Sequence, residues 1–122
     1  MGKKVFVYGT LLSGQENHRL LLRSCLVSAA AQTMPEFELV DLGAFPALVD
    51  GGRTAVAGEV YDVDDATLER LDSLESHPTF YERRKIRLAD GTSALAYFGK
   101  ESWTSGRPRL DCGDWRLKGV TS

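Results

Sequence analysis

The chain is a succession of short β-rich runs separated by glycine and proline, with only two stretches of helical pattern. Because these runs follow one another instead of alternating with helices, a doubly wound parallel sheet is disfavoured. The pattern predicts an α+β fold, with a small mixed, barrel-like sheet of about six strands and two short helices. The expected strands cover residues 3–8, 26–33, 36–42, 55–63, 81–88 and 93–98, and the expected helices cover 17–23 and 62–75.

The length of 122 residues is close to the commonest size of one domain. No internal repeat, low-complexity tract or linker-like change of composition divides the chain. The sequence therefore predicts a single domain over residues 1–122. Its tail, residues 100–122, is rich in glycine, proline and arginine, and no element is assigned to it.

Charge and composition limit the classes of partner. Lys and Arg total 15 against 17 for Asp and Glu, a formal net charge of −2, so neither nucleic acid nor an anionic membrane is an expected partner. No apolar run has the roughly 18 residues of a membrane helix, and no signal peptide is recognised, so a cytoplasmic location is expected. Cys25, Cys112, His18 and His77 follow no metal-ligand spacing, so no metal site is expected.

One carboxylate falls on the apolar face of the second predicted helix. At 100° per residue, Leu68 and Leu71 define that face, and Glu75 projects between their two directions. Burial and the negative end of the helix dipole would both raise the pKa of such a carboxyl, which suits general acid–base catalysis. Alternatively, the helix ends earlier and Glu75 points into water. Asp72 and Glu69 turn away from this face and are expected to be ordinary surface acids.

A glycine-bracketed loop follows the first strand. The strand stops at Tyr8, and Gly9 to Gly14 form the loop. Backbone N–H groups in such a turn can bind a carboxylate or a developing oxyanion. The loop matches neither GxxxxGK[ST] nor GxGxxG, so it is not a phosphate loop of those types. The alternative is a plain turn that ends a strand.

Several segments resemble the γ-glutamylcyclotransferase-like family. Val5 to Leu11, read as Val-Phe-Val-Tyr-Gly-Thr-Leu, is similar to its N-terminal signature, and Gly14 to Leu21 is similar to its γ-glutamylamine cyclotransferase branch. Gly58 to Tyr61 resembles the middle strand that leads into the helix. Leu71 to Ser76 and Tyr81 to Arg83 resemble the catalytic-glutamate segment and the strand after it. The resemblance spans roughly residues 4–99; the tail matches the larger members poorly.

The resemblance implies a cofactor-free enzyme that cleaves γ-glutamyl amides or peptides by intramolecular cyclisation, releasing 5-oxoproline and a free amine or amino acid. It implies Glu75 as the catalytic acid/base and Tyr8, Gly9, Thr10 and Leu11 as residues that bind the substrate. Tyr81 is a further candidate for substrate contact, or else an ordinary core aromatic. The expected partner is the small γ-glutamyl substrate, with the chain acting as a monomer or weak dimer.

Two alternatives remain open at this stage. The leaving group is an amine in some relatives and an amino acid in others, and the Gly14 to Leu21 match favours an amine slightly. The second alternative is that the chain is a non-catalytic member of the same fold and binds a small metabolite or peptide. It stays open because fold alone does not dictate chemistry. The presence of Glu75 favours the enzyme.

Overall fold

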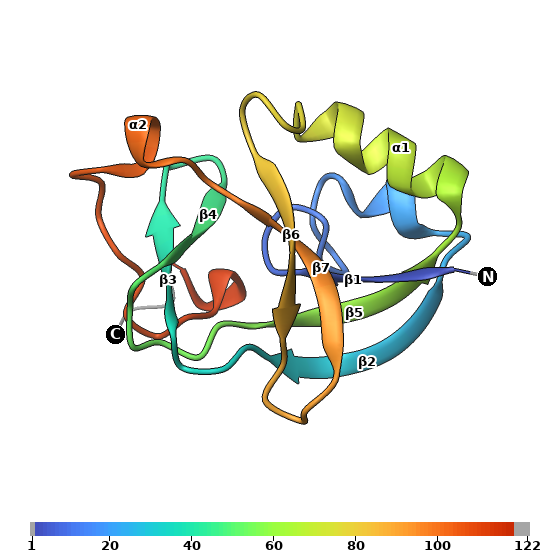
Figure 1. The fold of residues 1–122 in the computed structure, drawn as a ribbon, viewed down its shortest axis with the longest axis horizontal. Helices are drawn as coiled ribbons and strands as arrows, with labels where there is room; N and C mark the ends of the chain where they lie inside the picture. Colours follow the sequence, from blue (N-terminus) through green and yellow to red (C-terminus); the bar gives the residue numbers. More distant parts are fainter. Residues whose placement is uncertain (1, 119–122) are drawn as a thin grey trace.

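Seven strands form one sheet in the computed structural model, which describes residues 2–118 (Figure 1). Two α-helices and two 3-10 helices connect or cover the strands. The strands are β1 Lys3–Val7, β2 Cys25–Gln32, β3 Phe37–Asp41, β4 Pro46–Asp50, β5 Ala57–Val63, β6 Glu82–Arg87 and β7 Ser93–Phe98. The helices are α1 Asp65–Leu74 and α2 Glu101–Thr104, and the 3-10 helices are η1 His18–Leu21 and η2 Trp115–Leu117.

The sheet curls until its strands nearly meet. The strand order is β2-β5-β1-β7-β4-β3, with β6 also paired to β7. β1 is antiparallel to β5 and parallel to β7. A bridge between Thr33 and Leu88, with an Ala89 N–H to Gln32 O bond of 2.8 Å, joins the end of β2 to the end of β6. The predicted mixed, barrel-like α+β fold is therefore confirmed.

Three elements differ from the expectation. β4 brings the sheet to seven strands; it was not predicted, because its run is only five residues long and starts at Pro46. Proline is tolerated there because the first residue of a strand need not donate to the ladder. The helix expected over 17–23 is only the 3-10 helix η1. The second α-helix is instead α2, in the tail.

The core forms around β1, which lies between β5 and β7. Val5, Phe6 and Val7 are all at most 2% exposed. β5 approaches its neighbour β1 so closely at Gly58 that a Cβ there would lie 2.1 Å from the Val7 carbonyl oxygen. A glycine is required for this approach. It explains why a glycine interrupts an otherwise β-rich run.

Helix α1 lies over the part of the sheet formed by β1 and β5 (Figure 1). Asp64 caps its first turn, accepting the Thr67 N–H at 2.7 Å. Leu68 and Leu71 are buried, as the helical periodicity predicts. The helix ends at Leu74 with Glu75 as its C-cap, and the Glu75 N–H still donates to the Leu71 carbonyl at 3.0 Å. Glu75 is thereby fixed at the end of a packed helix.

The tail packs along β3 and against the start of β5. Its backbone exchanges three hydrogen bonds of 2.8 Å with Asp41, Leu39 and Ala57. Trp115 inserts its ring into the core and is 8% exposed. Residues 119–122 of the predicted tail lie outside the described residues.

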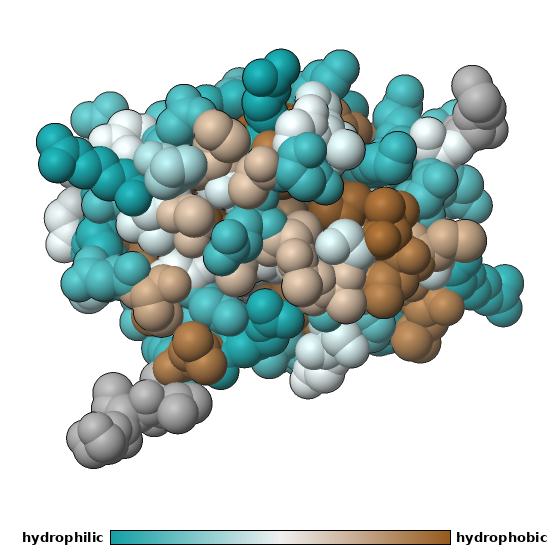
Figure 2. Space-filling view, turned by 90° about the horizontal axis from the view of Figure 1, so that it is seen from below, coloured by the Kyte–Doolittle hydropathy of each residue, from teal (hydrophilic) through white to brown (hydrophobic). Residues whose placement is uncertain are grey.

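β2, at one end of the strand order, carries apolar side chains on the surface. Figure 2 looks at the molecule from below, the side where Figure 1 shows β2, and apolar surface gathers on part of that face. Leu26 is 52% exposed and Val27 is 49% exposed.

Within residues 2–118, every helix is too short or too polar to cross a membrane.

Candidate active site

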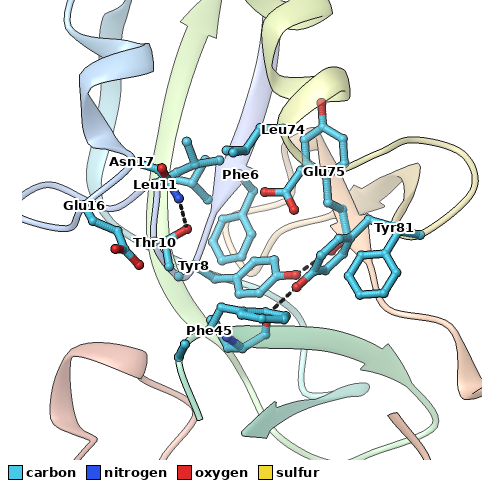
Figure 3. A pocket seen from close by; sticks show the side chains of 16 residues that line it. Phe6, Tyr8, Thr10, Leu11, Glu16, Asn17, Phe45, Leu74, Glu75 and Tyr81 are labelled. Carbon is cyan, nitrogen blue, oxygen red and sulfur yellow. Dashed lines mark hydrogen bonds between the residues drawn. The ribbon is translucent and has the colours of Figure 1, made fainter. Parts of the chain in front are cut away.

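A pocket of about 250 Å³ opens where β1 ends. The six residues that the sequence singled out for catalysis or binding all line it, although they come from distant parts of the chain (Figure 3). These are Tyr8, Gly9, Thr10, Leu11, Glu75 and Tyr81. The strand end, the glycine loop, the end of α1 and the segment before β6 therefore meet at one cavity.

Glu75 points its carboxylate into this pocket, toward the rings of Phe6 and Tyr8 (Figure 3). Its side chain is half-buried. Burial raises the pKa of Glu75 from 4.5 to about 7, because the charged form loses solvation. A carboxyl with that pKa can both accept and donate a proton near neutrality.

The hydroxyls of Tyr8 and Tyr81, two of the three tyrosines that line the pocket, bind the protein backbone. The Tyr8 hydroxyl donates to the Tyr97 carbonyl at 2.6 Å and accepts the Leu48 N–H at 3.1 Å. The Tyr81 hydroxyl donates to the Pro46 carbonyl at 2.8 Å. Burial, with the nearby Glu75 charge, raises the pKa of both phenols, so they stay protonated. Both rings are thus locked as walls of the pocket.

The glycine loop leaves backbone donors free at the pocket. Within residues 2–118, the N–H groups of Gly9, Thr10 and Leu11 donate to no backbone or side-chain acceptor, whereas the Leu12 N–H closes a turn onto the Gly9 carbonyl at 3.0 Å. Free N–H groups beside a cavity suit an anionic or carbonyl oxygen of a ligand.

Two polar side chains after the loop fix its shape. Asn17 Nδ2 donates to Thr10 Oγ1 at 3.0 Å. His18 Nδ1 lies 3.0 Å from the Leu11 carbonyl oxygen, and since a carbonyl can only accept, Nδ1 carries the proton. Asn17 itself lines the pocket, whereas His18 holds the loop from outside the lining.

Part of the lining was not predicted from the sequence. Pro46 begins β4, the strand that was not predicted, and Phe45 comes directly before it, while Glu16 follows the glycine loop. Phe80 lies at the cavity, is 39% exposed and stacks on Trp103 with ring centroids 4.2 Å apart. The sequence carried a usable signal for Glu16, which lies within the Gly14 to Leu21 segment, and for Phe80, which directly precedes Tyr81.

Asp72 is not the ordinary surface acid that the helical pattern predicts. It pairs with Arg83 on β6 and accepts the Tyr97 hydroxyl at 2.6 Å. Its side chain is 24% exposed and that of Arg83 is 26% exposed. The predicted surface position of Asp72 was wrong because the helical pattern carries no information about its two partners, which come from strands that follow the helix. The pair ties α1 to β6 and β7, one turn before Glu75.

Replacing this acid should cost stability. Asp72→Ala leaves the Arg83 guanidinium and a buried phenol without their partner, so we expect a loss of about 2–3 kcal/mol in the free energy of unfolding. Asp72→Asn keeps an acceptor for Tyr97 and should lose less. Denaturant titration measures both. Glu69→Ala, at an exposed position of the same helix, is the control, and an equal loss there would contradict the prediction.

The remaining candidate ligands do not gather. His77 accepts the Arg83 N–H at 3.0 Å and is not part of the pocket lining. Among residues 2–118, no group of three or more His, Cys, Asp or Glu side chains is arranged to hold a metal ion.

Comparison with known proteins gives a consistent family assignment. The family model described as gamma-glutamyl cyclotransferase, AIG2-like, matches residues 5–117. A Vibrio cholerae protein, named provisionally as a gamma-glutamylcyclotransferase, is 46% identical over 111 residues, covering 91% of this chain and 93% of that protein. The bovine protein named gamma-glutamylaminecyclotransferase is 43% identical over 93 residues, covering 70% of this chain and 55% of the bovine chain.

A solved structure supports the fold as well as the family. The crystal structure of an AIG2-like protein from Mus musculus superposes with a TM-score of 0.79 at 27% sequence identity. The match covers 90% of this chain and 86% of the mouse chain.

Proposed function

Because the chain belongs to the gamma-glutamyl cyclotransferase, AIG2-like family, we propose that it cleaves γ-glutamyl amides by intramolecular cyclisation, with Glu75 as the acid/base. The products are 5-oxoproline and a free amine. The reaction needs no cofactor in this proposal, because nucleophile and electrophile belong to the same substrate.

One observation supports this function most strongly. A carboxyl whose pKa lies at about 7 shares a cavity with the free amides of the glycine loop. Proton transfer and oxyanion binding are the two tasks that closing a lactam from an amide requires. The cavity volume of about 250 Å³ is suited to a compact group such as a glutamyl moiety.

The proposed reaction begins when Glu75 takes a proton from the substrate's α-ammonium. The freed amine nitrogen attacks the γ-carbonyl carbon and forms the five-membered ring. The N–H groups of Gly9, Thr10 and Leu11 would hold the substrate carboxylate or the oxyanion. The bond to the leaving nitrogen then breaks as Glu75 returns its proton there, and the ring nitrogen gives its second proton to the carboxylate that Glu75 regains. Folding the glutamyl chain into this geometry supplies much of the rate, because the reaction is intramolecular.

The direct test is to incubate the protein with a panel of γ-glutamyl amides and dipeptides and to measure 5-oxoproline release by mass spectrometry. We expect release with the wild-type protein and none above background with Glu75→Gln. Equal release by both proteins would reject Glu75 as the acid/base. Tight binding of panel members without any release would favour the non-catalytic reading instead.

We also expect a preference for leaving groups that carry a distal ammonium. Among the described residues, the charged side chains that line the pocket are Glu16 and Glu75, and both are acidic. A leaving group that ends in a carboxylate would therefore lack a cationic partner there. γ-Glutamyl diamines should have a higher kcat/KM than γ-glutamyl amino acids of similar length.

Glu16 is the residue that should set this preference. Because its side chain is exposed, Glu16→Gln should lower kcat/KM for a γ-glutamyl diamine by only about three- to fivefold, and added salt should shrink the difference. The matching uncharged alkyl amide should be unaffected. Glu69→Gln, outside the pocket lining, serves as the charge control. If Glu16→Gln lowered kcat/KM equally for the charged and the uncharged amides, Glu16 would not select the leaving group by its charge.

A further inference from the structure

A second acid is more deeply buried than Glu75 and lies outside the pocket lining. Glu59 on β5 is 5% exposed. Its Oε1 accepts the Ser13 N–H at 2.8 Å and the Tyr61 hydroxyl at 2.9 Å. The Arg116 guanidinium of η2 lies 4.0 Å from Oε2. The proposed reaction makes no use of this carboxylate.

Ser13 is the residue at which Glu59 reaches the glycine loop. The turn that leaves the Thr10 and Leu11 amides free ends at Leu12, whose N–H bonds the Gly9 carbonyl. Ser13 follows directly, and its N–H is anchored 46 residues away along the chain, on β5. The exit of the loop is therefore fixed by the Glu59 carboxylate.

A second route from Glu59 reaches the middle of the same loop. Tyr61 donates to Glu59, and the Tyr61 ring lies 5.7 Å from the His18 ring. His18 in turn donates to the Leu11 carbonyl. Fixing the Leu11 carbonyl also fixes the orientation of the peptide group that follows it. Glu59 thus supports the loop at two points.

Arg116 gives this buried acid a counter-charge from the tail. A carboxylate in the interior is costly unless hydrogen bonds and an opposite charge compensate it. Asp114 holds the Arg116 guanidinium from the other side, with an Nε to Oδ1 distance of 3.0 Å. η2 is therefore oriented toward Glu59 rather than simply lying on the surface.

We propose that Glu59 is a positioning residue that holds the free amides of the glycine loop in place at the pocket, with Arg116 of the tail as its counter-charge. The kinetic consequence rests on the proposed function, while the structural consequence does not. The tail, for which the sequence predicts no element, becomes part of the support of the site.

The test compares Glu59→Ala with Glu59→Gln. Because both donors bind Oε1, a glutamine can keep both hydrogen bonds through its amide oxygen, whereas alanine removes them. Hydrogen exchange followed by NMR should show at least tenfold faster exchange of the Ser13 amide in Glu59→Ala and a smaller change in Glu59→Gln. Ile86→Ala, a buried substitution in β6 outside the pocket, controls for general destabilisation.

Kinetics give a second readout. Glu59→Ala should lower kcat/KM for 5-oxoproline release by about 10- to 100-fold, while the apparent pKa of the pH profile stays near that of the wild type because Glu59 does not touch Glu75. Arg116→Gln should lower kcat/KM by an intermediate factor in the wild-type background. In the Glu59→Gln background, the same substitution should lower kcat/KM no further. Should Glu59→Ala fail to fold, Tyr61→Phe, which removes one donor, replaces it and should accelerate exchange in the loop.

The outcomes separate the two proposals. Unchanged exchange of the loop in folded Glu59→Ala would overturn the positioning role, whatever the activity. Faster exchange of the loop in Glu59→Ala, together with no 5-oxoproline release from the wild-type protein, would support the positioning role and reject the proposed function. Equal acceleration of loop exchange by Ile86→Ala would also overturn the positioning role, because it would reduce the effect to general destabilisation.

Discussion

Glu75→Gln is expected to lower kcat/KM by about 10²–10⁴-fold, the usual contribution of a positioned acid or base. The amide has nearly the shape of the carboxyl, but it cannot take the proton from the α-ammonium. In the wild type, kcat/KM should rise about tenfold per pH unit below the Glu75 pKa of about 7 and level off above it. Initial rates of 5-oxoproline release over pH 5–8.5 measure both effects.

The same substitution should make the protein more stable at high pH. The Glu75 pKa is about 7 in the folded state and near 4.5 when exposed, so above pH 7 the folded protein holds a carboxylate that unfolding would solvate. Glu75→Gln should then gain up to about 3 kcal/mol, since each pKa unit corresponds to 1.36 kcal/mol. The gain should shrink as the pH falls from 7 toward 4.5 and vanish below it, where both states are protonated.

Denaturant titrations of both proteins between pH 4 and 8.5 measure this difference. Glu69→Gln, which removes an exposed charge from the same helix, should show neither the loss of turnover nor the pH-dependent gain. A stability difference between Glu75→Gln and wild type that stays flat with pH would show that burial does not raise the pKa of this carboxyl.

Gly9→Ala is expected to lower kcat/KM by about 100-fold while leaving the protein folded. A Cβ at Gly9 would lie 2.6 Å from Pro46 Cγ and 2.7 Å from Pro46 Cδ. Pro46 is held by pairing with Asp41 and by the Tyr81 hydroxyl on its carbonyl. The glycine loop must therefore move instead, and a displacement near 1 Å of groups that hold the substrate has about this cost.

A double-mutant cycle with Pro46→Ala separates this clash from other effects. Pro46→Ala removes the two ring carbons that the new Cβ would meet. Activity in Gly9→Ala/Pro46→Ala should therefore recover in part relative to Gly9→Ala alone, a favourable coupling. Thermal unfolding should register a cost of about 1–3 kcal/mol for Gly9→Ala, typical of overpacking. Full activity in the single variant would mean that the close approach to β4 is not required.

The helix and its acid were the most predictable features of the site. Leu68, Leu71 and Glu75 share a face at helical spacing, and a repeat of that kind is visible in the sequence without any partner. The family resemblance pointed to the same acid. The structure places Glu75 at the pocket, while its catalytic role stays a prediction.

Residues whose environment depends on distant contacts were not predictable in this way. Glu59 lies in a strand buried on both faces, so alternation gives no sign of its partners, Ser13 and Arg116. Asp72 was expected on the surface for a similar reason, because β6 and β7 supply its partners. Pro46 obscured β4 and with it one wall of the pocket.

The residues that line the pocket come from two kinds of segment, packed elements and short connections, and the two kinds differ in how readily their sequences diverge. Glu75 and the glycine loop are set by α1 and β1, whereas Phe45 and Phe80 come from short connections that precede β4 and β6. Connections of this kind tolerate insertion and replacement far better than packed elements. Under the proposed function, changes in these two connections should therefore alter which amine is released, while Glu75 and the glycine loop stay in place. We accordingly expect that exchanging these two connections between relatives changes the preferred leaving group.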